Sequence, residues 1–161
     1  MKPQGLLFAA LHSQHDRIYG DSGTDVLRGD AGNDSIYGGI GADTIYGGAD
    51  STGSGSGNDS LDGGSGNDDL YGGDADDYLA GGDGADSLVG GVGRDTLTGG
   101  AGADTIQGGE GDDLIYFDAA DTTIDGGAGT DTLIIADEVL QRLDSNKVTN
   151  IEVIDLRGND L

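Results

Sequence analysis

Short apolar segments and glycine-rich turns alternate along this chain with a period of nine residues. The repeated pattern is Gly-Gly-x-Gly-x-Asp-x-U-x, in which U is a large aliphatic residue, and its clearest copies are residues 81–89, 90–98, 99–107 and 108–116. Three residues per copy favour β-structure, and only the middle one is regularly apolar. The pattern therefore predicts a very short strand followed by a six-residue turn that needs glycine for backbone angles with positive φ.

Two copies of this pattern make one coil of 18 residues. The second turn brings the chain back to its starting side, about 4.8 Å further along the stack. We therefore expect an all-β fold, a stack of parallel coils that forms two sheets, with 18 residues per coil. The aliphatic positions of both sheets face inward as a thin core, formed by Leu27, Ile36, Ile45, Leu61, Leu70, Leu79, Leu88, Leu97, Ile106, Ile115, Ile124 and Leu133.

The period divides the chain into three parts. Residues 1–15 form an N-terminal edge with a predicted capping strand at 6–11, and the array runs over residues 16–134, beginning as a half-repeat at Asp16. The copy at 47–62 is seven residues too long, which predicts a flexible loop at 49–55. Residues 135–161 are predicted to form a C-terminal cap, with a short helix at 137–143 and a strand at 148–156, in a chain cut from a longer protein.

Composition changes this picture because the chain cannot neutralise itself. The 161 residues include 34 glycines, no cysteine, and 31 acidic against 7 basic residues, which gives a formal net charge of −24. Only Glu110, Glu138 and Glu152 are glutamates, so the acids are mainly the short, rigid aspartate. Such a chain needs cations to fold and is a poor partner for nucleic acid. No apolar run is long enough for a membrane span.

The coil places the repeated aspartates in two columns. The first column contains Asp25, Asp43, Asp68, Asp86 and Asp104, and the second contains Asp34, Asp59, Asp77, Asp95, Asp113 and Asp131. Carboxylates stacked at strand spacing repel each other unless a counter-ion lies between them. Two carboxylates with several turn carbonyls form an all-oxygen cage, which suits Ca²⁺ better than Mg²⁺ or Zn²⁺. Adjacent pairs allow up to nine ions, which would bring the charge of −24 to −6.

These repeats resemble the repeats-in-toxin (RTX) family of calcium-binding β-rolls. The resemblance covers residues 16–134 and implies a right-handed parallel β-roll in which alternate turn carbonyls and the aspartate bind calcium together. The implied ligands beside the column aspartates are Gly39, Gly41, Gly64, Gly66, Gly82, Gly84, Gly91, Gly93, Gly100, Gly102, Gly109 and Gly111. Asp21, Asp30, Ala75 and Thr122 depart from the pattern and predict weaker sites. The ending at 149–156 is similar to the cap of large bacterial adhesins.

Other side chains offer little chemistry. Tyr19 and Tyr37 lie two copies apart, as do Tyr46 and Tyr71, which predicts stacked pairs on the sheet faces rather than a ligand site. The only histidines, His12 and His15, lie in the N-terminal edge and have no serine or cysteine nucleophile motif beside them. We therefore expect no enzymatic activity.

The first functional hypothesis is a calcium-dependent folding and structural module of a type I secreted bacterial protein. The alternatives are a surface adhesin module that binds polysaccharide or ice, or the non-catalytic C-terminal domain of a secreted hydrolase or epimerase. The exposed turn positions carry no regular Thr or Asn row, which disfavours ice. The expected partners are calcium ions and neighbouring domains of the parent protein, the chain is expected to be monomeric, and its predicted place is extracellular or at the cell surface of a bacterium.

Overall fold

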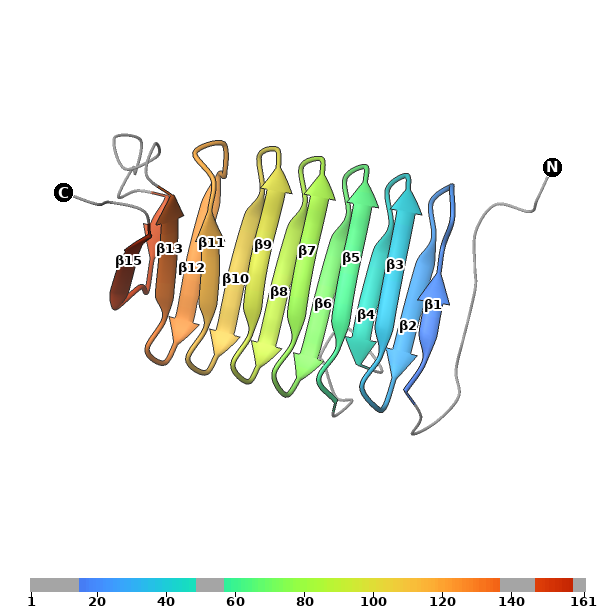
Figure 1. Ribbon diagram of the computed structural model, residues 1–161, viewed down its shortest axis with the longest axis horizontal. Coiled ribbons are helices and arrows are strands. Elements are labelled where there is room, and N and C mark those ends of the chain that lie inside the picture. Colours follow the sequence, from blue (N-terminus) through green and yellow to red (C-terminus); the bar gives the residue numbers. More distant parts are fainter. Residues whose placement is uncertain (1–14, 49–56, 137–146, 158–161) are drawn as a thin grey trace.

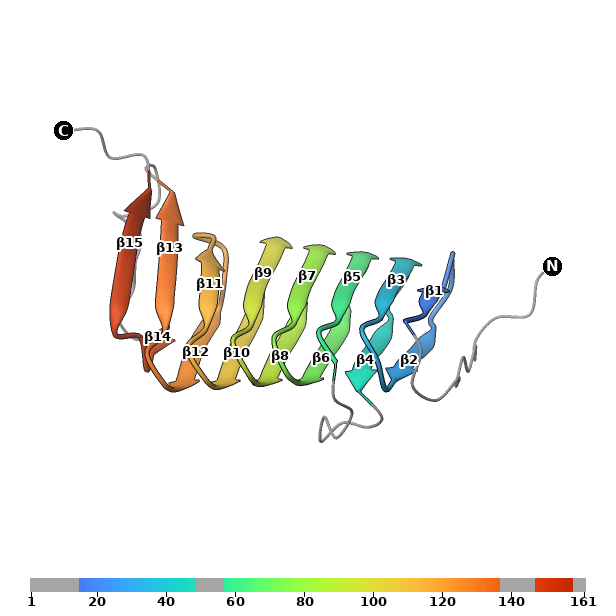
Figure 2. The same ribbon diagram turned by 60° about the horizontal axis from the view of Figure 1, so that its bottom comes forward.

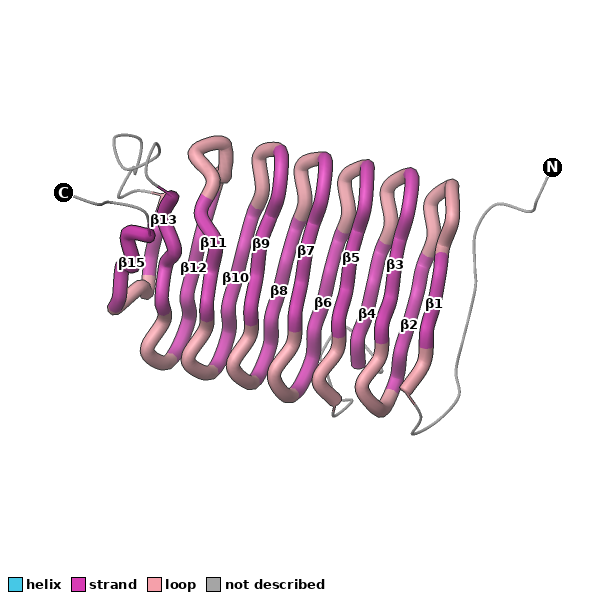
Figure 3. Tube along the Cα trace, viewed as in Figure 1, coloured by secondary structure: helices cyan, strands magenta, loops and turns pink. Residues whose placement is uncertain are grey.

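The chain folds into a solenoid of short parallel strands, as a computed structural model shows for residues 15–48, 57–136 and 147–157. Within these ranges all regular structure is β-strand (Figure 3). The strands are β1 (Arg17–Tyr19), β2 (Val26–Asp30), β3 (Ser35–Ile40), β4 (Thr44–Gly48), β5 (Ser60–Ser65), β6 (Asp69–Asp74), β7 (Tyr78–Asp83), β8 (Ser87–Val92), β9 (Thr96–Ala101), β10 (Thr105–Glu110), β11 (Leu114–Phe117), β12 (Thr123–Ala128), β13 (Thr132–Ala136), β14 (Val148–Thr149) and β15 (Val153–Arg157).

Consecutive strands belong to different sheets. The odd-numbered strands form an eight-stranded sheet in the order β1-β3-β5-β7-β9-β11-β13-β15, and the even-numbered strands form a seven-stranded sheet in the order β14-β12-β10-β8-β6-β4-β2. Every pairing is parallel and joins one coil to the next, for example Leu79 with Leu97. Figure 1 shows the two layers and the rows of turns along their edges. The predicted all-β fold with 18 residues per coil is confirmed.

The core is the single file of aliphatic side chains that the period predicts. All twelve predicted residues have at most 1% of their surface exposed. They alternate along each strand with outward-facing residues, because side chains of a strand point to opposite faces in turn. Burial also includes Ile18 in the opening half-repeat, and Phe117 and Ile135 near the other end. The thin core is therefore continuous from β1 to β13.

The strands are longer than the three residues that the sequence predicts. Most contain five or six residues, because they continue through the Gly-Gly pair of the next repeat, as Ser87–Val92 does. The glycines take part in the ladder, with Gly82 paired to Gly100. Flat stacking of identical segments lets even glycine pair with its copy in the next coil, so only about three residues per repeat remain as turn.

The C-terminal segment 148–156, which the sequence predicts to be one strand, forms two strands. The stretch 148–156 is divided into β14 and β15 by a turn at Asn150, which has a φ of 52°. Val148 pairs with Ile124 in one sheet, while Ile154 pairs with Leu133 in the other. The turn therefore makes this segment one more coil, as Figure 2 shows at the end of the stack.

Several predictions fall on residues outside the described ranges. These are the strand at 6–11, the loop at 49–55 and the helix at 137–143. The boundaries 1–15, 16–134 and 135–161 likewise stay predictions. Among the described residues, no helix has the length and apolar character needed to cross a membrane.

The predicted tyrosine pairs are confirmed. Tyr19 and Tyr37 stack with ring centroids 5.1 Å apart, and Tyr46 and Tyr71 stack at the same distance on the other sheet. The guanidinium group of Arg28 lies 4.6 Å from the centre of the Tyr46 ring. Stacked aromatic side chains of neighbouring strands stabilise the register between coils.

Candidate metal-binding columns

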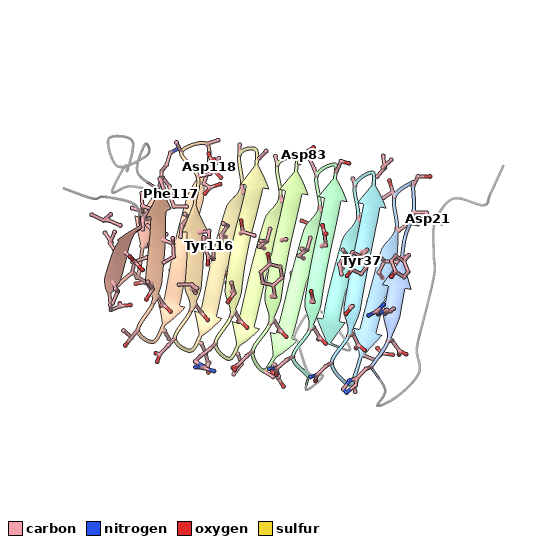
Figure 4. All side chains as sticks on the ribbon, viewed as in Figure 1. Asp21, Tyr37, Asp83, Tyr116, Phe117 and Asp118 are labelled. Carbon is pink, nitrogen blue, oxygen red and sulfur yellow. The ribbon has the colours of Figure 1, made fainter. Side chains whose placement is uncertain are left out.

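The two predicted columns of aspartates lie along the two opposite edges of the solenoid. Each aspartate stands directly before a strand, at the point where a turn brings the chain to the other sheet. The first column occupies turns that lead into even-numbered strands, and the second occupies turns that lead into odd-numbered strands. Asp83 and Asp118 mark the edge of the first column in Figure 4. All eleven predicted aspartates are buried, with Asp104 and Asp131 fully so.

Hydrogen bonds join each aspartate to its neighbour in the next coil. The backbone N–H of one donates to Oδ1 of the following one, at 2.7–2.9 Å in all nine predicted neighbour pairs. The bond from Asp34 to Asp59 spans 25 residues and has the same geometry as bonds that span 18. The long copy at 47–62 therefore leaves the column in register.

In ten of the eleven column aspartates, the second carboxylate oxygen is buried without a partner. Oδ2 is buried without a hydrogen bond in Asp25, Asp34, Asp43, Asp68, Asp77, Asp86, Asp95, Asp104, Asp113 and Asp131, and Asp59 is the exception in the columns. This oxygen lies over the first glycine of its own repeat. In the repeat that begins at Gly81, a Cβ atom on that glycine would stand 2.5 Å from Oδ2 of Asp86. A buried, unpaired carboxylate oxygen is unfavourable unless a positive charge compensates it.

Burial raises the pKa values of these carboxyl groups. It raises the pKa of Asp77 to about 8 and the pKa values of Asp59 and Asp95 to about 7, although a backbone hydrogen bond to each group acts in the opposite direction. The pKa values of Asp86 and Asp113 rise to about 6 for the same reason. Neighbouring carboxylates of the column add to the effect. Without a counter-ion, the columns therefore favour protons near neutral pH.

The predicted glycine ligands lie at the ends of the strands and in the turns that follow. The glycine at the second position of each repeat belongs to a strand, as Gly82 does to β7, and the glycine at the fourth position lies in the turn, as Gly84 does. All twelve have positive φ values, which glycine adopts without a side-chain clash. A side chain at Gly102 would overlap the carbonyl oxygen of Gly84 in the preceding coil. The carbonyl groups of the glycines at the fourth position of the repeat, such as Gly84, therefore point along the stack, toward the next coil. In the described turns, no backbone N–H donates to the carbonyl oxygen of a fourth-position glycine.

Three of the departures from the pattern keep the turn conformation. Asp21, Asp30 and Ala75 have φ values of 73°, 72° and 90° in the positions of glycines. Aspartate tolerates this region better than alanine does, because its short polar side chain bonds locally. Ala75 is therefore the most strained of the three. Thr122 is different, because its hydroxyl group donates to the backbone carbonyl oxygen of Asp104 at 2.8 Å and offers no carboxylate to the column.

The columns also include residues that the sequence did not assign to a site. Asp16 donates its backbone N–H to Oδ1 of Asp34 at 2.7 Å, and its own Oδ2 is buried without a partner. At the other end, the backbone N–H of Asp131 donates to Oε2 of Glu152 at 2.9 Å. Asp16 already stood in the aspartate place of a half-repeat. The place of Glu152 depends on the turn at Asn150, which no periodicity predicts.

The donor set fits a hard cation with oxygen ligands. Among the described residues there is no group of three or more His, Cys, Asp or Glu side chains close enough to share one ion. Each ion between two successive coils can therefore have at most two carboxylate ligands, and its further protein ligands have to be backbone carbonyls. Ca²⁺ accepts six to eight oxygen ligands of both kinds in flexible geometry. Zn²⁺ prefers His and Cys, which the columns lack.

Comparison with protein families finds the same repeat. The model of the RTX calcium-binding nonapeptide repeat matches four times, at residues 15–51, 54–88, 89–124 and 123–134. Comparisons with curated proteins and with solved structures give no match.

Proposed function

Because the chain belongs to the family of RTX calcium-binding nonapeptide repeats, we propose that it is a structural module in which calcium ions between successive coils drive folding. The family establishes calcium as the ligand of these repeats and confirms that prediction. The observation that carries the proposal is the series of buried Oδ2 atoms without partners along both edges.

The ligands of each ion come from two successive coils. One coil and the next each supply the Oδ2 atom of a column aspartate, as Asp77 and Asp95 do in the second column. Glycines at the ends of the strands and in the turns supply carbonyl oxygens, such as those of Gly91 at the end of β8 and Gly93 in the turn after it. The carbonyl of Gly93 points along the stack, since a side chain at Gly111 would overlap it. Bound calcium supplies positive charge between two carboxylates that otherwise repel each other.

Folding is coupled to calcium because the chain has few other sources of stability. The core is one aliphatic residue deep per strand, and the formal net charge is −24. Hydrophobic burial of this extent does not offset the entropy of 34 glycines together with the repulsion of the columns. Metal ligands that approach each other only in the folded chain convert binding free energy into folding free energy.

This coupling suits a protein that works outside a bacterial cell. Extracellular calcium modules bind with Kd values of about 10⁻⁴–10⁻³ M. The chain would remain unfolded at low calcium concentration during type I secretion and would become rigid outside. There it would space or support the neighbouring domains of its parent protein, and we expect no catalysis from the repeats themselves.

Calcium titration of the full chain tests the proposal. In EGTA, far-UV circular dichroism should show a disordered chain, and calcium in the millimolar range should produce β-structure in one cooperative transition. Magnesium at equal concentration is the control and should produce little structure, because it keeps its waters and demands a tight octahedron. Full β-structure in EGTA at neutral pH would contradict the proposal.

A further inference from the structure

The turn at residues 117–122 breaks the repeat and replaces its glycines with Phe-Asp-Ala-Ala-Asp-Thr. Its own carboxylates order it. The backbone N–H of Asp118 donates to Oδ2 of Asp121 at 2.8 Å, and the N–H of Ala120 donates to Oδ1 of Asp118 at 2.7 Å. Asp118 lies at the edge of the first column (Figure 4). This turn therefore follows Asp104 in that column without the Gly-rich sequence.

Asp121 takes the position of a column aspartate from a different place in the turn. Only 1% of its surface is exposed, and its Oδ1 is buried without a partner. Asp104 is fully buried, and its Oδ2 also lacks a partner. Thr122, the residue after Asp121, donates both its backbone N–H and its hydroxyl group to the carbonyl oxygen of Asp104 at 2.8 Å, which places the two aspartates side by side in successive coils. Two buried carboxyl groups therefore lie next to each other here, each with an oxygen that has no partner. Burial raises the pKa of Asp121 to about 7, and the negative charge of Asp104 adds to the rise.

A lysine that contacts this turn binds its backbone and not the two carboxylates. The Lys147 ammonium group donates to the backbone carbonyl oxygen of Asp121 at 2.7 Å. Over the described ranges, the salt bridge that the structure shows joins Arg94 to Asp76, elsewhere in the solenoid. Lys147 thus holds the turn through its backbone and forms no salt bridge with the carboxylate of Asp104 or Asp121.

We propose that Asp104 and Asp121 form an additional calcium site, which lies outside the nonapeptide pattern. The proposal builds on the function proposed above, since it extends the first column by one ion. Its side-chain ligands are Oδ2 of Asp104 and Oδ1 of Asp121, which are hard oxygen donors suited to Ca²⁺. Asp118 adds a further negative charge beside Asp121. Because Lys147 precedes β14 and contacts this turn, the site would also fix the last coil to the array.

Crystals of the full chain grown with calcium test the site directly through anomalous difference maps. The expected result is a peak between Asp104 and Asp121 in addition to peaks along the two columns. Peaks along the columns without one between Asp104 and Asp121 would overturn this inference alone, and would indicate that the two carboxyl groups share a proton. No peaks in any position would overturn the proposed function as well.

The variant Asp121→Asn provides a second measurement by native mass spectrometry. It removes the charge and keeps an acceptor oxygen for the N–H of Asp118, so the chain should bind one calcium ion fewer than the wild type. Asp83→Asn is the matched control, because Asp83 is an exposed acid at the end of β7 on the same edge. It should keep the full number of ions. An unchanged number in Asp121→Asn would overturn the inference, and the diffraction experiment on the wild type decides the matter if that variant does not fold.

Discussion

The backbone N–H of Asp77 donates a hydrogen bond of 2.9 Å to Oδ1 of Asp95, and Oδ2 of Asp95 remains buried without a partner. One carboxylate thus has two roles. One oxygen fixes the register between coils, and the other is left for a cation. The two roles can be separated experimentally, because asparagine retains an acceptor oxygen and loses the charge.

Asp95→Asn should weaken calcium binding at two steps, since Asp95 lies between Asp77 and Asp113. We expect the chain to bind two ions fewer with high affinity and the calcium midpoint of folding to rise on the order of tenfold. Isothermal titration calorimetry and circular dichroism measure both effects. Asp83→Asn carries the same charge change at the exposed end of β7 and should behave as the wild type. Equal midpoints in the two variants would exclude Asp95 as a ligand.

Acid should favour the folded chain when calcium is absent. The pKa of Asp77 is raised by burial to about 8 and that of Asp95 to about 7, against an ordinary value of 3.8. Between these values the folded state binds more protons than the unfolded state, so its stability falls as pH rises. In EGTA, lowering the pH from about 8 to about 5 should therefore increase β-structure by circular dichroism.

The calcium-bound chain should respond in the opposite direction. Protons compete with calcium for the same carboxylates, so the calcium midpoint should rise as the pH falls over that range. Calcium binding at neutral pH should release protons, which calorimetry in buffers of different ionisation enthalpy detects. Calcium binding without proton release would show that the columns are already ionised before the metal binds.

Ala75→Gly should stabilise the protein. Ala75 has a φ of 90°, where a Cβ atom is strained, and glycine relieves this strain. We expect the free energy of unfolding in saturating calcium to rise by about 1 kcal/mol, measured by urea denaturation. Ala103→Gly is the control at an exposed turn position whose φ is not positive, and it should destabilise by about 0.5 kcal/mol. A loss of stability in Ala75→Gly would contradict the strained turn.

Leu97→Ala should test the importance of the thin core. Leu97 is fully buried in β9, and its truncation should lower the free energy of unfolding by about 3 kcal/mol, because a cavity opens with no second layer to fill it. Val92→Ala removes a half-exposed aliphatic side chain and should change stability by less than about 0.5 kcal/mol. Similar effects of the two changes on urea denaturation would mean that calcium alone holds the coils together.

The period of nine residues predicts most of the fold because every coil repeats the same environment. It places the core, with Leu27 and Leu133 near its ends, and it places the column aspartates and the tyrosine pairs. The period does not predict the position of a residue where that position depends on tertiary contacts. Asp121 is one residue out of phase, and only the fold of its own turn brings it beside Asp104. Glu152 reaches the second column through the turn at Asn150, which lies outside the repeat.

The sequence predicts the strand lengths wrongly for a different reason. Glycine disfavours an isolated strand, so sequence propensity ends each strand before Gly-Gly. In the stack, Gly82 pairs with Gly100 because the adjacent coil presents an identical backbone. Pairing between coils outweighs the propensity of a single coil.

The pairing of each strand only with the strand one coil away makes the molecule modular in length. Duplication or loss of one coil adds or removes two core aliphatics and one aspartate on each edge, while all other neighbours stay the same. Reach and metal content can therefore change together during evolution, in equal increments and without redesign of the ends.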